Sequence, residues 1–348
     1  MASLSRAGLK LKVIPWRAGF ERLSPVAVDY PSAELQPINL VHLNLDFLFS
    51  GDLNNPPLDD IVTPDHYNIL IPYWELASVP VEWTGVIRRF DEVWCASSFM
   101  ARSLATIAKG PVRVVRPAIE FPGGGGRKTR CDFELPEDRF IFFCAADTGS
   151  ILARKNPKAL VEAYIEEFAP SEGACCVVKI IYSDPNQPDI GDIVSIARLR
   201  TDVIFMERQL DEQSMFDLYG LIDCYVSPHR SEGLGLTLLE AMNAGKPVIA
   251  TAYGGVADFV NQDVAYPIDY RLVKVGKDRL PYPEQFTWAD PLQSSLRSAM
   301  RFVYRNRDET ISVGLKGHAH MRSMFSLDRT AAEIRAEISR IWNGGQNR

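Results

Sequence analysis

The sequence predicts an α/β protein made of two Rossmann-like domains, and three observations support this prediction. Short apolar runs typical of strands alternate with helix-forming stretches, which is the pattern of a parallel sheet covered by helices. At 348 residues the chain is long enough for two such domains, each with its own core. Pro122–Pro136 contains a run of glycines, local charge and no periodicity, as expected of an interdomain linker. We therefore expect an N-terminal domain over residues 1–121, a linker over 122–136 and a C-terminal domain over 137–325.

The composition excludes several classes of protein. A net charge of −6 disfavours nucleic acid as a partner. No apolar run approaches the roughly 18–20 residues of a membrane-spanning helix, and Met1–Val13 lacks the apolar core of a signal peptide. The six cysteines show no Cys-x-x-Cys spacing and indicate no disulfide framework. We therefore expect a cytoplasmic protein.

The expected elements of the first half are short. Its strands are Lys10–Pro15, Ile38–Leu45, Tyr67–Pro72, Asp91–Ala96 and Val112–Arg116. The stretch Ser50–Pro64 is rich in Pro, Asn and Asp and indicates a loop. Val81–Phe90 is expected to be helical, and Ser97 is expected to cap the helix that follows it.

The second half continues the same alternation. Its expected strands are Phe140–Ala145, Cys175–Ser183, Asp202–Met206, Pro247–Ala250 and Ala265–Ile268. Its expected helices are Pro157–Phe168, Leu210–Asp223 with Asp211 as its cap, Thr237–Ala244, Val256–Asn261, Leu292–Tyr304 and Leu327–Trp342. The Lys-, Arg- and Pro-rich stretch Arg271–Phe286 is expected to be an excursion without a regular element.

The stretch Ser227–Gly255 is the centre of the functional argument. Two glycines, Gly233 and Gly235, precede a helix start, where backbone amides and a dipole worth roughly 0.3–1 kcal/mol favour an anion. Glu232 lies in the loop and Glu240 about one and a half turns into the helix, so both carboxylates can face the mouth above the strand ends. Taken alone, these residues are equally compatible with an ordinary loop and helix carrying two surface glutamates.

The full block EGLGLTLLEAMNAGKPVIAT resembles the retaining group 1 glycosyltransferases of family 4 type. In the first half, NILIPYWELASVP, FDEVWCASSF and VRVVRPAIEFP resemble strand ends of the bacterial polysaccharide-building branch of this family. The resemblance implies the GT-B fold, two Rossmann-like domains facing across a cleft. It also implies that Glu240 binds the donor ribose and that Glu232 lies beside the transferred sugar. The turn that would carry the donor pyrophosphate is formed by Gly233, Leu234, Gly235 and Leu236.

A second block, Arg154-Lys155-Asn156-Pro157, is similar to the motif with which this family grips the pyrophosphate. A cation contributes on the order of 1.5–3 kcal/mol per charge-assisted hydrogen bond to a departing diphosphate. Alone, Arg154 and Lys155 are compatible with solvated cations at a helix start. A cation pair at a helix N-terminus is, however, electrostatically misplaced unless an anion lies there too.

Other positions carry weaker expectations. The resemblance implies that the loops at Tyr182-Ser183 and Arg208–Leu210 contact the nucleotide base, which includes Leu210 in the donor site. His229 could touch the donor, although a hydrogen-bonded loop histidine is an equally good interpretation. Where better-known relatives have a histidine, this chain has Tyr73-Trp74-Glu75.

The ends of the chain carry expectations as well. The chain opens at Ser5–Leu9 with what resembles the end of a first helix, so the N-terminal domain is expected to lack its first strand and helix. The C-terminal helix, residues 326–348, is expected to pack back on the N-terminal domain. The basic segment through Arg22 is expected either to contact the inner membrane face weakly or to be a strand with an exposed loop.

These inferences predict a retaining, metal-independent hexosyltransferase, with Glu232, Lys155 and Arg154 as its catalytic residues. A nucleotide-diphosphate sugar would be the donor, and a saccharide or lipid-linked saccharide the acceptor. No metal is expected, because the chain has no Asp-x-Asp motif and no His and Cys spacing typical of zinc. Two alternatives stay open: a catalytically impaired sugar-nucleotide-binding or scaffold protein, and a different GT-B enzyme such as a sugar-nucleotide epimerase.

Overall fold

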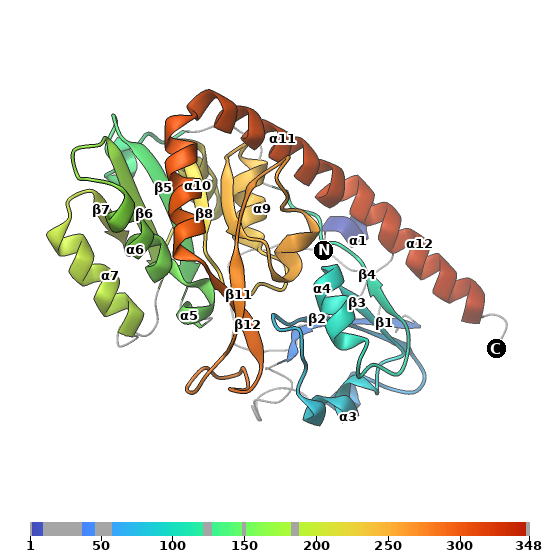
Figure 1. The fold of residues 1–348 in the computed structure, drawn as a ribbon. Helices are drawn as coiled ribbons and strands as arrows, with labels where there is room; N and C mark the ends of the chain where they lie inside the picture. Colours follow the sequence, from blue (N-terminus) through green and yellow to red (C-terminus); the bar gives the residue numbers. More distant parts are fainter. Residues whose placement is uncertain are drawn as a thin grey trace. The chain divides into compact units, whose positions relative to one another are not determined.

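The computed structural model describes residues 2–9, 37–45, 58–120, 127–147, 151–181 and 188–345. Two compact units are present: Met1–Ala118 with Leu327–Arg348, and Ile119–Ser326 (Figure 1). The expected strand Lys10–Pro15 and the basic segment through Arg22 lie outside the described residues. The same holds for the start of the Ser50–Pro64 loop and for the glycines of the expected linker.

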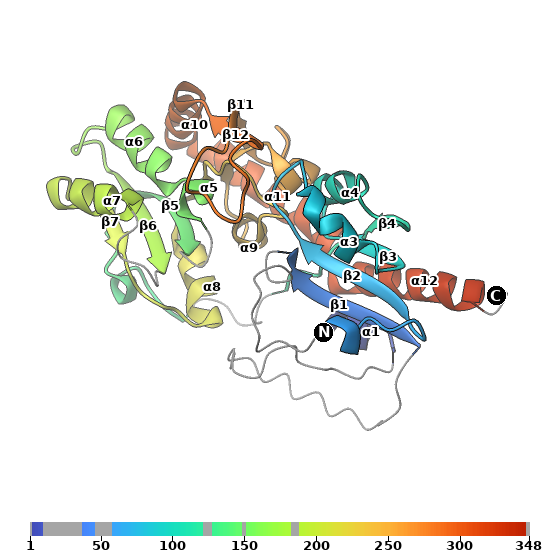
Figure 2. The ribbon, with the colours of Figure 1, turned by 90° about the horizontal axis from the view of Figure 1, so that it is seen from below.

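The first unit contains a four-stranded parallel sheet in the order β1-β2-β3-β4 (Figure 2). Its strands are β1 (Ile38–Asn44), β2 (Tyr67–Tyr73), β3 (Glu92–Cys95) and β4 (Val112–Val114). Its other elements before the C-terminal helix are α1 (Ala2–Arg6), η1 (Leu58–Asp60), η2 (Val81–Trp83), α3 (Thr84–Ile87) and α4 (Ser98–Leu104). Ser97 caps α4 as expected, because its Oγ accepts from the Met100 amide at 3.3 Å. The single helix expected over Val81–Phe90 is instead η2 followed by α3.

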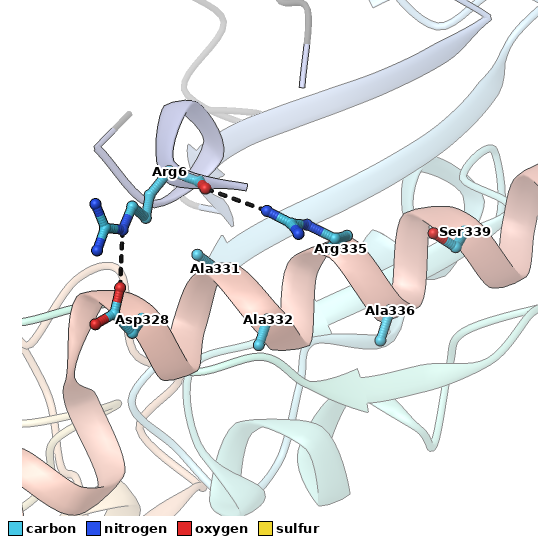
Figure 3. A pocket seen from close by; sticks show the side chains of 7 residues that line it. All are labelled: Arg6, Asp328, Ala331, Ala332, Arg335, Ala336 and Ser339. Atoms are coloured by element: carbon cyan, nitrogen blue, oxygen red, sulfur yellow. Dashed lines mark hydrogen bonds and ion pairs between the residues drawn. The ribbon is translucent and has the colours of Figure 1, made fainter. Parts of the chain in front are cut away.

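The C-terminal helix α12 (Leu327–Gly345) packs on this sheet together with α1. Buried side chains of α12, including Ala331 and Ile334, share a core cluster with Ile69 and Trp94 of the sheet. Figure 3 shows the hollow along α12, where Arg6 donates to Asp328 at 2.8 Å. None of the expected site residues lines this hollow.

The second unit contains a six-stranded parallel sheet in the order β10-β9-β8-β5-β6-β7. Its strands are β5 (Phe140–Asp147), β6 (Ala174–Ile181), β7 (Val203–Met206), β8 (Cys224–Ser227), β9 (Val248–Thr251) and β10 (Tyr266–Ile268). The chain runs from β5 outward to β7 and then returns to β8 on the other side of β5. The strand order therefore reverses between β5 and β8, and in open α/β sheets ligands bind at the carboxyl ends of the strands at such a point.

The helices of the second unit are α5 (Leu152–Lys155), α6 (Pro157–Glu167), α7 (Pro188–Leu199), α8 (Glu212–Leu221), α9 (Leu236–Asn243), α10 (Gln293–Arg305) and α11 (Arg307–Phe325). Pro157 begins α6 and Asp211 caps α8, as expected, with Asp211 Oδ1 accepting from the Ser214 amide at 2.6 Å. Figure 1 shows α6 and α7 beside β6 and β7, on the face whose core also includes α10.

Several elements of this unit differ from the expectations. Helices α5, α7 and α11 are not among the expected elements. The helix expected over Val256–Asn261 is a 3-10 turn, η4 (Gly254–Asp258). The Arg271–Phe286 excursion contains most of strand β11 (Tyr270–Lys274) and the loop that joins it to β12 (Thr287–Pro291) in an antiparallel hairpin.

The described part of the expected linker is held against α8. Lys128 Nζ donates to Ser214 Oγ at 2.6 Å, and Arg130 donates to the Leu221 carbonyl and to the Asp223 carboxylate. Residues 131–133 form a 3-10 turn, η3 (Cys131–Phe133), with Phe133 buried. These contacts place residues 127–136 in the second unit, whose boundary falls at Ile119.

Candidate functional site

Two segments meet at the point where the strand order of the second unit reverses. One is α5, the first described helix after β5, and the other is the loop that joins β8 to α9. Arg154 and Lys155 lie in the last turn of α5, so they are not at the start of α6 as expected. Asn156 then reverses the chain with φ 56°, and its side chain donates to the Pro228 carbonyl at 3.0 Å. The α5–α6 junction is thereby fixed to the β8–α9 loop.

Glu232 of the β8–α9 loop bridges the two cations of α5. Its Oε2 lies 3.0 Å from Arg154 Nη1, and its Oε1 lies 2.6 Å from Lys155 Nζ. Arg154 is 4% exposed and Glu232 5% exposed, so this is an ion cluster largely removed from water. The sequence predicted that an anion lies beside Arg154 and Lys155. In the free protein this anion is the carboxylate of Glu232.

The charge state of Glu232 follows from this cluster. Burial alone would raise the pKa of Glu232, but the charges of Lys155 and Arg154 outweigh it and lower the pKa to about 2. The side chain is therefore a carboxylate throughout the neutral range, with no proton to donate. It can supply negative charge, but it cannot act as a general acid.

Gly254 and Gly255 of η4 lie against the backbone of the Glu232 loop. The amide of Gly255 donates to the Glu232 carbonyl at 2.7 Å. Gly254 has φ 78°, and a Cβ at this position would lie 2.4 Å from the same carbonyl oxygen. The backbone of η4 approaches Glu232 so closely that only glycine fits there.

His229 is fully buried in the same loop, and both ring nitrogens lie against protein groups. Its Nδ1 is 3.0 Å from Ser227 Oγ, and its Nε2 is 3.2 Å from the Tyr253 carbonyl. Burial lowers the pKa of His229, which favours a neutral ring. These contacts favour the interpretation of His229 as a hydrogen-bonded loop residue.

Glu240 lies on α9 and is held by a tyrosine of α8. Tyr219 Oη donates to Glu240 Oε2 at 2.8 Å, so a hydroxyl ligand would use the other carboxylate oxygen. Burial raises the pKa of Glu240, although the hydrogen bond from Tyr219 and the charge of Lys155 act in the opposite direction. Tyr219 is itself fully buried, and the structure shows that it positions this carboxylate.

The remaining expected site residues surround the start of α9 and α8. Gly235 has φ 91° at the N-cap of α9, and a Cβ there would lie 2.7 Å from Val256 Cγ2. Gly233 precedes it in the loop, Leu234 is buried and Leu236 is 46% exposed. Leu210 lies partly buried just ahead of α8. Tyr182-Ser183 lies outside the described residues.

A further polar residue of this sheet edge was not expected from the sequence. Lys179 lies in β6, two residues before the strand ends, and it is 3% exposed. The run VVKII is typical of a buried strand, and its lysine alone gives no signal of function. Among the described residues, no group of three or more His, Cys, Asp or Glu side chains is placed to hold a metal ion.

Comparison with known proteins points to a single family for this region. Residues 141–278 match the family model described as glycosyl transferases group 1. The match contains Arg154, Lys155, Glu232 and Glu240.

Curated relatives give the same indication. The lipopolysaccharide core biosynthesis mannosyltransferase LpsB of Rhizobium meliloti is 35% identical over 149 residues, covering 41% of this chain and 34% of that protein. A D-inositol 3-phosphate glycosyltransferase of Mycolicibacterium smegmatis is 27% identical over 233 residues, covering 59% of this chain and 51% of that protein. The chain spans about half or less of the length of these relatives.

Solved structures resemble the chain over most of its length. Sucrose-phosphate synthase of Thermosynechococcus elongatus matches with a TM-score of 0.62 and 18% identity, covering 88% of this chain and 74% of that one. HepE of Anabaena, solved with UDP and glucose, matches with a TM-score of 0.59 and 15% identity, covering 79% and 72%. At these identities the likeness concerns the fold, and it confirms the expected α/β architecture of GT-B type. Across the described residues, no helix combines the length and apolar character that crossing a bilayer requires.

Proposed function

We propose that this chain transfers a sugar from a nucleotide-diphosphate donor, because it has the GT-B fold and residues 141–278 match the model of group 1 glycosyl transferases. The observation that carries the proposal is the buried cluster of Arg154, Lys155 and Glu232 at the reversal point of the second sheet. Two cations and one carboxylate there match the charges of a departing diphosphate and of a sugar that becomes positive in the transition state.

Each residue of the cluster has a distinct proposed role. Lys155 and Arg154 stabilise the diphosphate as it leaves, assisted by the amides at the start of α9. Glu232 stays ionised beside them and supports positive charge on the sugar, a role consistent with its lowered pKa. Glu240, held by Tyr219, accepts hydrogen bonds from the ribose hydroxyls.

The finer features of the reaction belong to the same proposal. We propose retention of configuration and a hexose donor, supported by the sequence resemblance and by the relative named as a mannosyltransferase. The acceptor is a saccharide or a lipid-linked saccharide. We also propose that no metal is needed, since Lys155 and Arg154 supply the positive charge that a divalent ion would otherwise provide. Transfer is then expected to continue at an unchanged rate in excess EDTA.

Calorimetric titration with UDP and GDP tests the donor site. Lys155→Ala and Glu240→Ala are each expected to weaken binding of the preferred nucleotide about ten-fold or more, because each removes a charged hydrogen-bonding group. Lys158→Ala is the matched control, since Lys158 lies on α6 and pairs with Asp192 at the surface. Unchanged affinity in both site variants would count against the proposal. Binding without transfer of label from a panel of nucleotide sugars to glycolipid acceptors would instead favour a sugar-nucleotide-binding protein.

A further inference from the structure

Lys179 has a buried side chain that the proposed reaction does not use. It is 3% exposed. Burial lowers the pKa of Lys179 to about 8, and the charge of Asp147 acts in the opposite direction. Burying an amine costs free energy unless a protein group or a bound group supplies an acceptor. A ligand that offers an acceptor at this place would therefore be favoured by Lys179.

The strand register shows which face of the sheet Lys179 occupies. Its neighbours in sequence, Val178 and Ile180, belong to the core cluster under α6, α7 and α10. Side chains alternate along a strand, so Lys179 faces the opposite side. There it is paired with Ala145 of β5, two residues beyond Phe143.

The same face carries the side chains that position Glu240. The ring of Phe143 lies 6.0 Å from the ring of Tyr219, and Tyr219 donates to Glu240. Phe143 is also paired with Val177, which points to the same face as Lys179. Glu240 and Lys179 thus lie on one face of the sheet, with Tyr219 and Phe143 in contact between them.

Lys179 also lies at the ligand-binding edge of that face. It is two residues from the carboxyl end of β6, and β6 adjoins β5, whose following loop leads to Arg154 and Lys155. Adjacent strands lie about 4.8 Å apart, so one strand spacing separates β6 from the reversal point beside β5. In the proposed donor complex the diphosphate lies at that point and the ribose at Glu240. The nucleobase is the part of the donor that remains to be placed on this face.

We propose that Lys179 donates a hydrogen bond to the exocyclic carbonyl oxygen of the donor's nucleobase and so selects uracil or guanine over cytosine or adenine. This inference rests on the proposed function. An ammonium group has three donors and no acceptor. Uracil O4 and guanine O6 accept such a bond, whereas cytosine and adenine carry an amino group at the corresponding place.

Calorimetric titration with four nucleoside diphosphates tests the selection. The wild-type protein is expected to bind UDP at least about ten-fold more tightly than CDP, or GDP at least about ten-fold more tightly than ADP. Lys179→Met keeps the length of the side chain and removes its donors. It is expected to reduce that ratio to about three-fold or less by weakening the complex with the keto base.

Lys246→Met is the matched control. Lys246 is another partly buried lysine of this unit, but its Nζ donates to the Gly220 carbonyl at the C-terminal end of α8. Its replacement is expected to leave the nucleotide ratio unchanged. Thermal unfolding without nucleotide gives a second readout: Lys179→Met is expected to be at least as stable as the wild type, because it removes the cost of burying an amine.

The outcomes separate the inference from the proposed function. If the wild type binds none of the four nucleotides, the proposed function fails. If it binds them and Lys179→Met keeps the wild-type ratio, or loses affinity equally for all four, the selection by Lys179 is refuted while donor binding stands. Equal wild-type affinity for keto and amino bases refutes it as well.

Discussion

At the scale of single residues, the charge balance of the candidate site depends on Glu232. Arg154 and Lys155 already share one carboxylate in the free protein, at 3.0 and 2.6 Å. A diphosphate that enters the site adds negative charge beside the same two cations. Glu232 therefore both orders the cations and competes with the ligand for them, and the balance of these two effects can be measured.

Replacing Glu232 with glutamine is expected to separate the two effects. The amide keeps the shape of the side chain but leaves Arg154 and Lys155 without their counter-charge, so we expect UDP or GDP to bind about ten-fold more tightly. The free variant is expected to lose roughly 3–5 kcal/mol of stability at pH 7, because the buried carboxylate that pairs with Arg154 and Lys155 loses its charge. Sugar transfer is expected to fall by at least about 100-fold, since charge support for the sugar is lost. Calorimetry, urea unfolding and a transfer assay measure the three quantities.

Glu172→Gln is a suitable control, since Glu172 pairs with Arg301 away from the candidate site. It should change neither nucleotide affinity nor transfer. Weaker nucleotide binding by Glu232→Gln would show that ordering of the cations outweighs competition for them.

The sequence predicted part of this site and missed the rest for physical reasons. The spacing of Glu232 and Glu240 and the Arg154-Lys155 pair are local patterns, and local patterns are visible in a sequence. The ion pairs between the two blocks depend on a loop contact between distant segments of the chain. Lys179 was missed because its meaning depends on which face of β6 is buried under helices, which no single strand reveals.

At the scale of elements, a buried carboxylate attaches α12 to the sheet of the first unit. Glu92 of β3 is fully buried, and Arg340 of α12 reaches both of its oxygens, at 2.7 and 2.6 Å. Tyr67 and Trp94 donate to the same carboxylate at 3.0 and 2.9 Å. Burial would raise the pKa of Glu92, but the hydrogen bonds from Arg340, Trp94 and Tyr67 lower it.

Arg340→Met is expected to loosen α12 selectively. Removing one partner of a buried carboxylate is costly, but Arg340 is partly exposed and Arg113 Nε stays 2.9 Å from Glu92 Oε1, so we expect roughly 1–2 kcal/mol. Amide hydrogen exchange should become faster in α12 and stay unchanged in the second unit. The lowered pKa of Glu92 means that its contribution is present above the ordinary glutamate pKa and is lost as the pH falls below it. In the wild type, exchange in α12 should therefore accelerate as the pH falls below about 4.5, after correction for intrinsic rates.

The control for this prediction lies on the same helix. Arg329 pairs with Glu333 one turn further along at 3.0 Å, in an exposed i,i+4 arrangement worth only about 0.3–0.5 kcal/mol. Arg329→Met should leave exchange in α12 nearly unchanged. Equal effects of the two substitutions would show that Glu92 does not hold the helix.

The predicted bounds of strands and helices were correct where the sequence pattern was apolar and regular. Buried strands such as β5 and β6 are apolar except for Asp147 at the end of β5 and Lys179 in β6, and both were expected within two residues of their observed bounds. Helix α11 was missed because it is mostly polar and contains Gly314 and Gly317, which lower helix propensity. In the structure these glycines allow close packing, since a Cβ would lie 2.5 Å from the Gly245 carbonyl oxygen and 2.7 Å from that of Val264. The close approach of other backbone segments to these two glycines is visible only in the folded structure.

At the scale of the whole molecule, the second unit is one continuous segment, whereas the first is assembled from both ends of the chain. The ends of the second unit meet, because the Ile119 amide donates to the Phe325 carbonyl at 2.9 Å. Both residues are buried, and the ring of Phe325 packs against Phe259 at 5.8 Å. The unit has its own six-stranded sheet, its own core and all the residues of the proposed donor site.

A protein consisting of residues 119–326 is therefore expected to fold alone and to bind nucleotide. Its sheet and its core are formed within the segment and its two ends are joined, so separation exposes no broken strand of its sheet. We expect a single cooperative unfolding transition and an affinity for UDP or GDP within about three-fold of the full chain, with transfer activity absent because the acceptor side is missing. The fragment with Lys155→Ala serves as the control and should bind at least about ten-fold more weakly. A folded fragment that binds no nucleotide, while the full chain does, would show that the first unit contributes directly to the donor site.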